Sequence, residues 1–380
     1  MPAATAAMRF VLYGLAAMSL YTGYRVYFSS PPSPALDTHT SGSLGTLPTH
    51  ADGRTPLSRR TVAVADLHGD LAHALNVLSM ASVLSVSGDK YTWVGGHDVL
   101  VSTGDIVDRG DDTIALYRLF MTLREQAARA GGEVKNCLGN HEVMNALGDW
   151  RYVTPGDVKS FGGVEARRAA MSSTGWIGQD WLRHYNVTHT IPLLPPSHPA
   201  LPTGYTPPRM SFVHGGITPH YATLGTHHIN TLGSSFLTKA LSQPTPTSWL
   251  RPNTTTDEQL LWSENGPLWF RGYASDPPAT ACPNAAQATQ LLGVTQLVMG
   301  HTPHFDGFVT RCNNTVLLID TGISRAYGGE QSALVIDFDL IPVDGSSDGK
   351  SRWIEKQTLT ALYKGRKPTV LSSTETTLWL

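Results

Sequence analysis

Short apolar runs separated by polar, glycine-containing segments are the dominant pattern along this chain. Three of these runs are rich in β-branched residues and short enough for buried strands, namely Thr61–Ala65, Val99–Ser102 and Val134–Leu138. The first two are followed by stretches whose apolar residues have helical spacing, Leu71–Leu84 and Thr113–Ala130. A strand–loop–helix repeat of this kind predicts parallel strands joined by right-handed crossovers.

The second half of the chain contains further strand-like runs, and we find no internal repeat. These runs suggest a second, more antiparallel sheet that packs on the first. They are Arg209–Val213, Gln296–Met299, Phe305–Arg311, Val316–Asp320, Ala333–Phe338 and Trp353–Gln357.

Five short polar segments each follow one of the apolar, strand-like runs. Loops at the carboxyl ends of parallel strands are the usual place for chemistry in α/β sheets, so we expect the five segments to converge. They are Asp66-Leu67-His68-Gly69-Asp70, Gly104-Asp105-Ile106-Val107-Asp108-Arg109-Gly110, Gly139-Asn140-His141-Glu142, His214-Gly215-Gly216 and Gly300-His301-Thr302.

The side chains of these segments are the ligands that a pair of divalent metal ions requires. Carboxylate, amide and imidazole donors without thiolate suit hard or borderline ions. Asp66 and His68 lie two residues apart at a strand exit and can bind one ion. Asp105 is the natural bridge, because an anion between two cations lowers their repulsion. The remaining expected ligands, all at the second ion, are Asn140, His214 and His301.

Each of these residues has an ordinary structural explanation when it is considered alone. Asp66 could cap the helix that follows it, Asp105 could be a turn residue, and Asn140 could be a helix cap. His214 or His301 alone would more often be a hydrogen-bonded loop or core histidine. The metal hypothesis depends on finding all of them, in order, at strand exits.

At these motifs the chain resembles the calcineurin-like metallophosphoesterases and, within them, the protein phosphatase branch. GDIVDRG at 104–110 and GNHE at 139–142 have the form typical of that branch. GPLWFRGY at 266–273 and Gly322-Ile323-Ser324, followed by Tyr327-Gly328-Gly329, resemble the Shewanella-like protein phosphatases. One departure is Ala65, where the family usually has Gly, and we expect it to change the turn slightly without loss of the metal.

The resemblance implies a fold and a reaction. The expected fold is α/β, a four-layer α/β/β/α sandwich with cap insertions. The expected reaction is direct hydrolysis of a phosphate monoester by a hydroxide that bridges two divalent ions, Mn, Fe or Zn. We see no phosphate-binding loop with a cysteine in the sequence, so we expect no covalent phosphoenzyme intermediate.

Further residues are assigned to the substrate by the same resemblance. His141 is expected to protonate the leaving oxygen, with Asp108 orienting its ring. Arg109 and Arg271 are expected to hold the phosphate, together with Asn140. A structural loop role for His141, and stacking of Arg271 on Trp269 or Tyr273, are the alternatives. Glu142 is expected to support its loop.

Two long stretches separate the motifs. Asp149–Pro208 contains helical candidates at Phe161–Ser172 and Ile177–Tyr185, and then becomes proline-rich. Thr218–Thr295 is the second stretch. We expect both to cap the metal cleft and select substrate, since loops commonly carry such functions. Plain surface insertions are the alternative.

Composition and charge limit the partners. The chain has 380 residues, of which only 15% are charged, and its formal net charge is −2. This gives no argument for nucleic-acid binding, so none is expected. An enzyme that binds phosphate can be weakly acidic overall, because its metals supply the local positive field.

The N-terminal segment predicts membrane targeting. Residues 10–28 are mostly apolar and are followed by a region rich in Ser, Pro and Thr. The segment lies between a cleaved signal peptide and a signal anchor in length, and we favour the anchor. We divide the chain into the anchor or signal peptide (residues 1–28), a flexible stalk (29–60), a catalytic domain (61–365) and a C-terminal tail (366–380). A soluble cytosolic protein with a disordered tail is the alternative.

Sequons and cysteines bear on the compartment. Cys282 and Cys312 lie in turn-like surroundings and are able to pair in an oxidising lumen, or to remain two free thiols. Cys137 is expected to be a buried free thiol. We expect a catalytic domain in the lumen or outside the cell, or a secreted protein. The N-glycosylation acceptors are Asn186, Asn253 and Asn313.

The leading functional hypothesis is a metal-dependent phosphatase that acts on a phosphorylated protein. A small-molecule phosphoesterase, for example one that hydrolyses nucleotides or sugar phosphates, is the second. A non-catalytic binding protein is disfavoured, because all six expected ligands and His141 are present.

Overall fold

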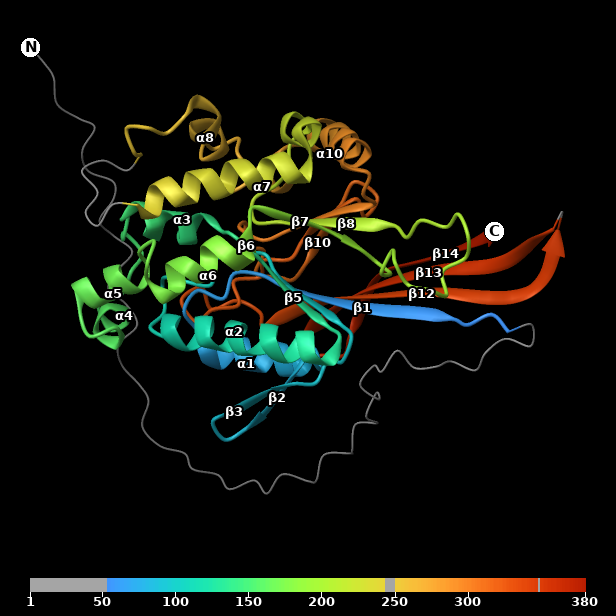
Figure 1. Ribbon diagram of the computed structural model, residues 1–380, viewed down its shortest axis with the longest axis horizontal. Helices are drawn as coiled ribbons and strands as arrows, with labels where there is room; N and C mark the ends of the chain where they lie inside the picture. Colours follow the sequence, from blue (N-terminus) through green and yellow to red (C-terminus); the bar gives the residue numbers. More distant parts are fainter. Residues whose placement is uncertain (1–52, 243–249, 348) are drawn as a thin grey trace, which may run out of the picture. The chain divides into compact units, whose positions relative to one another are not determined.

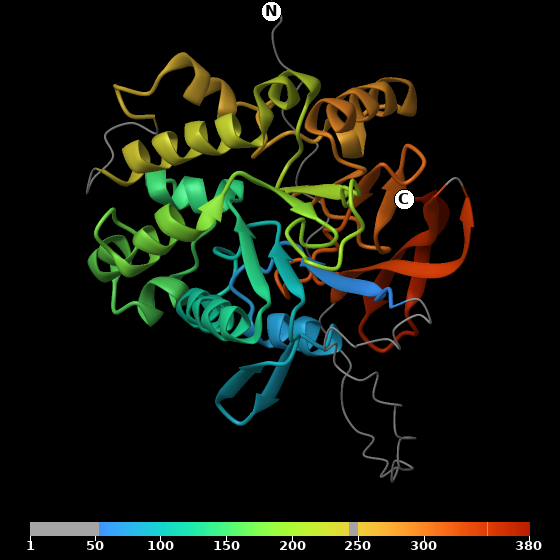
Figure 2. The same ribbon diagram turned by 45° about the vertical axis from the view of Figure 1, so that its right-hand side comes forward.

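The computed structural model describes residues 53–242, 250–347 and 349–380. Within these residues, two main sheets pack between layers of helices (Figures 1 and 2). The expected signal segment and most of the expected stalk lie outside the described residues. None of the helices in the described part of the chain is long and apolar enough to cross a bilayer.

The larger sheet has the strand order β14-β13-β12-β1-β4-β5-β6. Four of its strands are parallel, and β12, β13 and β14 extend the sheet in antiparallel fashion. The strands are β1 (Leu57–Val64), β4 (Val99–Ser102), β5 (Glu133–Cys137), β6 (Tyr185–Asn186), β12 (Ser332–Ser347), β13 (Lys350–Tyr363) and β14 (Thr369–Trp379).

The smaller sheet has the order β10-β11-β9-β8-β7, with three parallel central strands and an antiparallel strand at each edge. A separate hairpin, β2 (Leu84–Ser87) with β3 (Lys90–Trp93), projects beneath the helices (Figure 1). The strands of the smaller sheet are β7 (Thr188–Pro192), β8 (Arg209–Val213), β9 (Gln296–Met299), β10 (Val309–Arg311) and β11 (Val316–Leu318).

Helices cover the outer face of each sheet. In Figure 1, α1 and α2 lie below the larger sheet, and α7 and α10 lie above the smaller one. The helices are α1 (Leu71–Met80), α2 (Thr113–Ala130), α3 (Asn140–Leu147), α4 (Pro155–Ser160), α5 (Val164–Ala170), α6 (Trp176–His184), α7 (Pro219–Leu241), α8 (Thr256–Leu261), α9 (Gly272–Ser275) and α10 (Pro278–Leu292).

The layers follow from the alternation of side chains along each strand. Val62 of β1 clusters with Leu78 of α1, whereas its neighbour Ala63 clusters with Phe212 and Val298 of the smaller sheet. One apolar core therefore lies between the sheets and another lies under the helices. The expected four-layer α/β/β/α sandwich is confirmed.

Several expectations about individual elements were wrong. The runs Ala333–Phe338 and Trp353–Gln357 belong to the larger sheet, because β12 pairs with β1 and β13 pairs with β12. The smaller sheet is mixed and not mainly antiparallel. The expected tail at 366–380 contains β14, whose many β-branched Thr residues suit a strand even though most of its side chains are exposed.

Boundaries near the motifs also differ from expectation. The last four residues of the expected stalk, 57–60, are the start of β1. The first helix ends at Met80 instead of Leu84, because Ser82 has a φ of 55° and the chain then enters β2. The expected helix Phe161–Ser172 is shorter in the structure, where only α5 (Val164–Ala170) is helical, because Gly162 and Gly163 before it have φ of 89° and 120°. A separate helix, α4, precedes these glycines at Pro155–Ser160.

The two long stretches between motifs have different roles in the fold. The first supplies α4, α5 and α6. The second supplies α7 and α10, whose apolar faces, including Phe236 and Ala285, are buried in the core. The second stretch is therefore largely the fourth layer of the sandwich, and its segment around Trp269 and Arg271 forms hydrogen bonds with the His301 motif.

Candidate metal centre

The five motifs converge because each follows a strand of the two facing sheets. The parallel strands β1, β4 and β5 run in the same direction, and so do β8 and β9. Their carboxyl ends therefore lie at the same edge of each sheet, and backbone hydrogen bonds join the motifs, for example from His68 N to Asp105 O at 3.0 Å. The residues at these strand exits are Asp66, Asp105, Asn140, His214 and His301.

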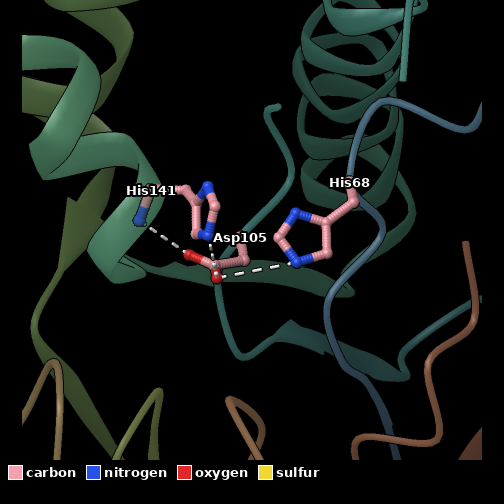
Figure 3. A group of neighbouring side chains, drawn as sticks. All are labelled: His68, Asp105 and His141. Carbon is pink, nitrogen blue, oxygen red and sulfur yellow. Dashed lines mark hydrogen bonds and ion pairs between the residues drawn. The ribbon is translucent and has the colours of Figure 1, made fainter. Parts of the chain in front are cut away.

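Two groups of buried side chains have their potential ligand atoms within 4.8 Å of one another. One group is His68, Asp105 and His141, and the other is Asp105, His214 and His301. Figure 3 shows the first group, with both imidazoles directed at the Asp105 carboxylate. Asp105 belongs to both groups, which is the arrangement that a bridging carboxylate requires.

The structure brings all six predicted metal-binding residues together. Asp105 Oδ2 lies 3.8 Å from His68 Nε2 and 3.2 Å from His214 Nε2. Asp66 Oδ2 lies 4.0 Å from His68 Nε2, and Asn140 Oδ1 lies 2.8 Å from His214 Nε2. The mixed oxygen and imidazole donor set fits divalent ions such as Mn, Fe or Zn.

Backbone carbonyls orient the imidazole rings. His68 Nδ1 donates to Val107 O and His214 Nδ1 donates to Thr103 O, both at 3.0 Å, because a carbonyl oxygen only accepts. The Nε2 atom of His68 is then left with its lone pair toward the site, as a metal ligand requires. His214 Nε2 faces two acceptors, Asn140 Oδ1 at 2.8 Å and Asp105 Oδ2 at 3.2 Å, so it carries a proton that a metal ion would replace. In the His301 ring the roles of the two nitrogens are reversed, because Nε2 donates to the backbone carbonyl of Trp269.

The electrostatics of the cluster favour a cation. Burial, together with the nearby carboxylates of Asp320 and Asp105, raises the pKa of Asp66 well above its usual value. Burial lowers the pKa of His68 to about 3, so this ring is neutral, as a ligand must be. Burial opposes charge on His214, yet Asp105 and Asp66 raise its pKa to about 9. The carboxylates thus attract positive charge to the place where a divalent ion would supply it.

The backbone at the motifs adopts an uncommon conformation. Nine non-glycine residues among those described have positive φ, and five of them carry motif side chains. Such strained positions cluster at functional sites, because the surrounding structure must hold them in place. The five are His68, Asp105, Asp108, Arg109 and His301.

His141 lies beside the ligands and is held by Asp108. Its Nδ1 lies 2.7 Å from Asp108 Oδ2, and its Nε2 lies 3.8 Å from Asp105 Oδ2. Sequence reasoning missed the residues behind this pair. Asn145 donates to the second oxygen of Asp108, and the buried Arg167 donates to Asn145. No motif marks either residue in the sequence.

Glu142 supports the loops, as expected. Its carboxylate accepts hydrogen bonds from the backbone N–H groups of Asp105, Ile106 and Gly139 at 2.8–2.9 Å. The hydroxyl of Tyr117 donates to it as well, at 3.1 Å. Glu142 therefore joins the backbones of the second and third motifs.

Arg109 is held between two aromatic rings that sequence reasoning did not assign to the site. Its guanidinium carbon lies 4.3 Å from the centre of the Tyr152 ring and 4.8 Å from that of Tyr327. The Tyr327 ring also lies 5.4 Å from that of His68. Nε of Arg109 is buried and makes no hydrogen bond within the described residues.

Arg271 contacts the motif that contains His301. Its Nη1 donates to His301 O at 2.7 Å and to Thr302 Oγ1 at 3.0 Å. The backbone carbonyl of Trp269, two residues before Arg271, accepts a hydrogen bond from His301 Nε2 at 3.1 Å. The aromatic segment therefore positions His301 and places an exposed guanidinium beside it.

Asp320 is a further buried carboxylate near the ligands. It ends the run Val316–Asp320, accepts a hydrogen bond from Gly322 N at 2.9 Å, and has its pKa raised to about 6 by burial. A carboxylate at a strand exit was the available signal. It was missed because the motif Gly322-Ile323-Ser324 that follows it was used only for the family resemblance, and no histidine lies beside Asp320.

Comparison with known proteins identifies the family. Residues 59–305 match the model of the calcineurin-like phosphoesterases. An uncharacterised protein of Schizosaccharomyces pombe is 41% identical over 72% of this chain and 76% of its own length. The chain therefore belongs to the calcineurin-like phosphoesterase family, and it is an enzyme of the metal-dependent phosphatase class.

More distant relatives agree with the subgroup expected from the motifs. Shewanella-like protein phosphatase 2 of Arabidopsis thaliana is 26% identical over 70% of this chain and 72% of that protein. Shewanella-like protein phosphatase 1 of Plasmodium berghei is 25% identical over 70% of this chain and 67% of that protein. A solved cold-active protein-tyrosine phosphatase of a psychrophilic Shewanella has the same fold, with a TM-score of 0.61, 24% identity, and coverage of 82% of this chain and 80% of that one.

Proposed function

We propose that this chain hydrolyses phosphate monoesters on proteins, with two divalent ions in the cluster described above. The observation that carries the proposal is that Asp105 belongs to both groups of potential ligands, with the six predicted ligands gathered around it. The names of the relatives support a protein substrate.

The residues present fit two ions. Asp66 and His68 would hold one, His214, His301 and Asn140 would hold the other, and Asp105 would contact both. When bound, the ions would activate a water and neutralise the phosphoryl oxygens.

The protein's own groups would bind the phosphate and move a proton. Arg109 stacks on Tyr327, whose ring contacts that of His68, and Arg271 donates to His301 O. Both would present guanidinium groups to the phosphoryl oxygens, and the amide of Asn140 would join them. His141 would donate a proton from Nε2 to the leaving oxygen, because Asp108 holds the proton on Nδ1 and stabilises the charged ring. Leaving-group protonation matters most for alkyl esters, whose alkoxides leave poorly.

The test is Asp105→Asn together with measurement of bound metal. We expect it to lower activity by several orders of magnitude and to reduce the metal content, since the amide cannot bridge two cations. Asp89→Asn, in the exposed turn between β2 and β3, is the matched control and should change nothing. Normal activity in Asp105→Asn, or full activity after metal removal by a chelator, would overturn the proposal. Side-by-side assay of phosphopeptides and phosphorylated metabolites would reveal a small-molecule phosphoesterase instead.

We also propose that the catalytic domain acts in the lumen of the secretory pathway or outside the cell, membrane-anchored or secreted. The disulfide between Cys282 and Cys312 supports an oxidising compartment, whereas Cys137 is a buried free thiol. Asn253 and Asn313 are exposed and available for glycosylation.

A further inference from the structure

A buried ionic network connects the helices α4 and α5 to the pair formed by Asp108 and His141. Arg167 of α5 and Asp157 of α4 both have fully buried side chains. Arg167 Nε donates to Asp157 Oδ2 at 2.8 Å, and its Nη1 donates to Asn145 Oδ1 at 2.7 Å. Its Nη2 lies 3.6 Å from Asp108 Oδ1 and makes no hydrogen bond within the described residues.

This network fixes which way the Asn145 amide points. An arginine only donates, so the oxygen of the amide must face Arg167 and its nitrogen must face the other way. That nitrogen donates to Asp108 Oδ1 and to His141 O, each at 2.9 Å. The remaining carboxylate oxygen, Oδ2, is then the one directed at His141 Nδ1, at 2.7 Å.

The cost of burying these charges argues for a role beyond packing. A buried ion pair contributes little to stability compared with apolar residues of the same shape, because each charge loses its hydration. Aromatic rings also surround Arg167, with Trp150 centred 4.7 Å and Phe161 5.6 Å from its guanidinium carbon. An apolar side chain would fill such a space at least as well.

We propose that Arg167 is a positioning residue that acts through Asn145 and Asp108 to orient His141 for proton donation. The inference rests on the proposed role of His141 as the proton donor. It makes the first long stretch between the motifs part of the catalytic machinery, because Arg167 reaches the pair from that stretch. Within the described residues, the polar contacts of Arg167 are with Asp157, Asn145 and Asp108, none of which is an expected metal ligand.

The test compares good and poor leaving groups in the full-length enzyme. Arg167→Met removes the donor, and Asp157→Asn/Arg167→Met removes both charges so that no unpaired carboxylate stays buried. Both variants should lower kcat for an alkyl phosphate by about 10–100-fold. Both should lower kcat for 4-nitrophenyl phosphate less than about threefold, because nitrophenolate leaves without a proton, and bound metal should be unchanged. Arg168→Met, the next residue on α5, is the matched control and should leave both rates unchanged.

Combination with His141→Ala separates positioning from general loosening. If Arg167 acts through His141, adding Asp157→Asn/Arg167→Met to His141→Ala should cause no further loss. An additive loss, or an equal loss with both leaving groups, would overturn the inference. If neither Arg167 variant folds, Asn145→Ala takes their place. This variant should lower kcat more for the alkyl phosphate than for 4-nitrophenyl phosphate, and an equal loss for both substrates would overturn the inference as well. If His141→Ala itself shows no dependence on the leaving group, the proposed role of His141 fails, whatever Arg167 does.

Discussion

Gly139 and Asp105 are packed so closely that no side chain fits between them. A Cβ atom on Gly139 would lie 2.8 Å from the carboxyl carbon of Asp105 and closer still to its Oδ1. The backbone of Gly139 is extended, with φ of −93° and ψ of 174°, a conformation open to any residue. The glycine of the third motif is therefore explained by space for the shared carboxylate and not by its backbone.

Gly139→Ala should consequently displace Asp105 and weaken metal binding. We expect a loss of activity of at least 10-fold with reduced metal content, and a stability cost of about 1–3 kcal/mol from overpacking. Metal analysis, kcat and thermal unfolding of the purified variant measure these effects. Wild-type metal content and activity in Gly139→Ala would contradict the prediction, because the loop would then accommodate the methyl group without displacing Asp105.

His141→Ala should lower kcat by about 10²–10⁴ while the metals stay bound, because it removes the proton donor and not an assigned ligand. The loss should shrink for nitrophenyl phosphate. Rates across a series of phenyl phosphates with different leaving-group pKa values measure this. Loss of bound metal would identify His141 as a ligand, which its place in the group with His68 and Asp105 permits.

Arg109→Lys should weaken phosphate binding although the charge is kept. The lysine lacks the planar fork and stacks poorly between Tyr152 and Tyr327, so kcat/KM should fall by about 10–100-fold, mainly through KM. Arg118→Lys is the control, since Arg118 also stacks on a ring, that of Trp176 at 5.7 Å, but on α2. An unchanged KM for Arg109→Lys would show that Arg109 does not hold the phosphate.

Features encoded over a few residues were predictable from the sequence. Val99–Ser102, Arg209–Val213 and Thr113–Ala130 have the bounds expected from their periodicity. The convergence of the motifs followed from a single rule about the carboxyl ends of strands, and the geometry brings the six expected ligands together.

Long-range pairing was not predictable in the same way. Nothing in Ala333–Phe338 shows that it pairs with β1, nearly 280 residues earlier, and the polar strand β14 resembled a tail because most of its side chains are exposed. Arg167 and Asn145 escaped notice because they act through buried contacts between α3 and α5. A lone arginine on a short helix is normally a surface residue.

The disulfide between Cys282 and Cys312 should stabilise the helix that it joins to the smaller sheet. It links α10 to the end of β10, where Arg311 also donates to the carbonyls of Tyr273 and Asp276. For a sequence separation of 30 residues, removal should cost about 3–4 kcal/mol of unfolding free energy.

Denaturant unfolding of Cys282→Ser/Cys312→Ser measures this cost, and reductant should destabilise the wild type by the same amount. Reductant should have no further effect on the double variant, which is the control for the free thiol Cys137. Equal midpoints for wild type and variant would contradict the prediction.

The last prediction concerns the compartment and distinguishes the three sequons. Asn253 and Asn313 are exposed, whereas Asn186 is partly buried in β6 and its sequon threonine, Thr188, is buried with Oγ1 donating to Phe212 O at 2.8 Å. A glycan on Asn186 would have to emerge from a sheet edge, so we expect glycans on Asn253 and Asn313 only.

Glycosidase treatment of protein from its native host should increase its electrophoretic mobility. Asn253→Gln and Asn313→Gln should each remove one step of that shift, and Asn186→Gln, the control, should remove none. Only a domain in the lumen or outside the cell meets the glycosylation machinery, and the disulfide would also form there. No shift in any form, combined with protease sensitivity of the domain in intact vesicles, would place the domain in the cytosol and contradict the proposed location.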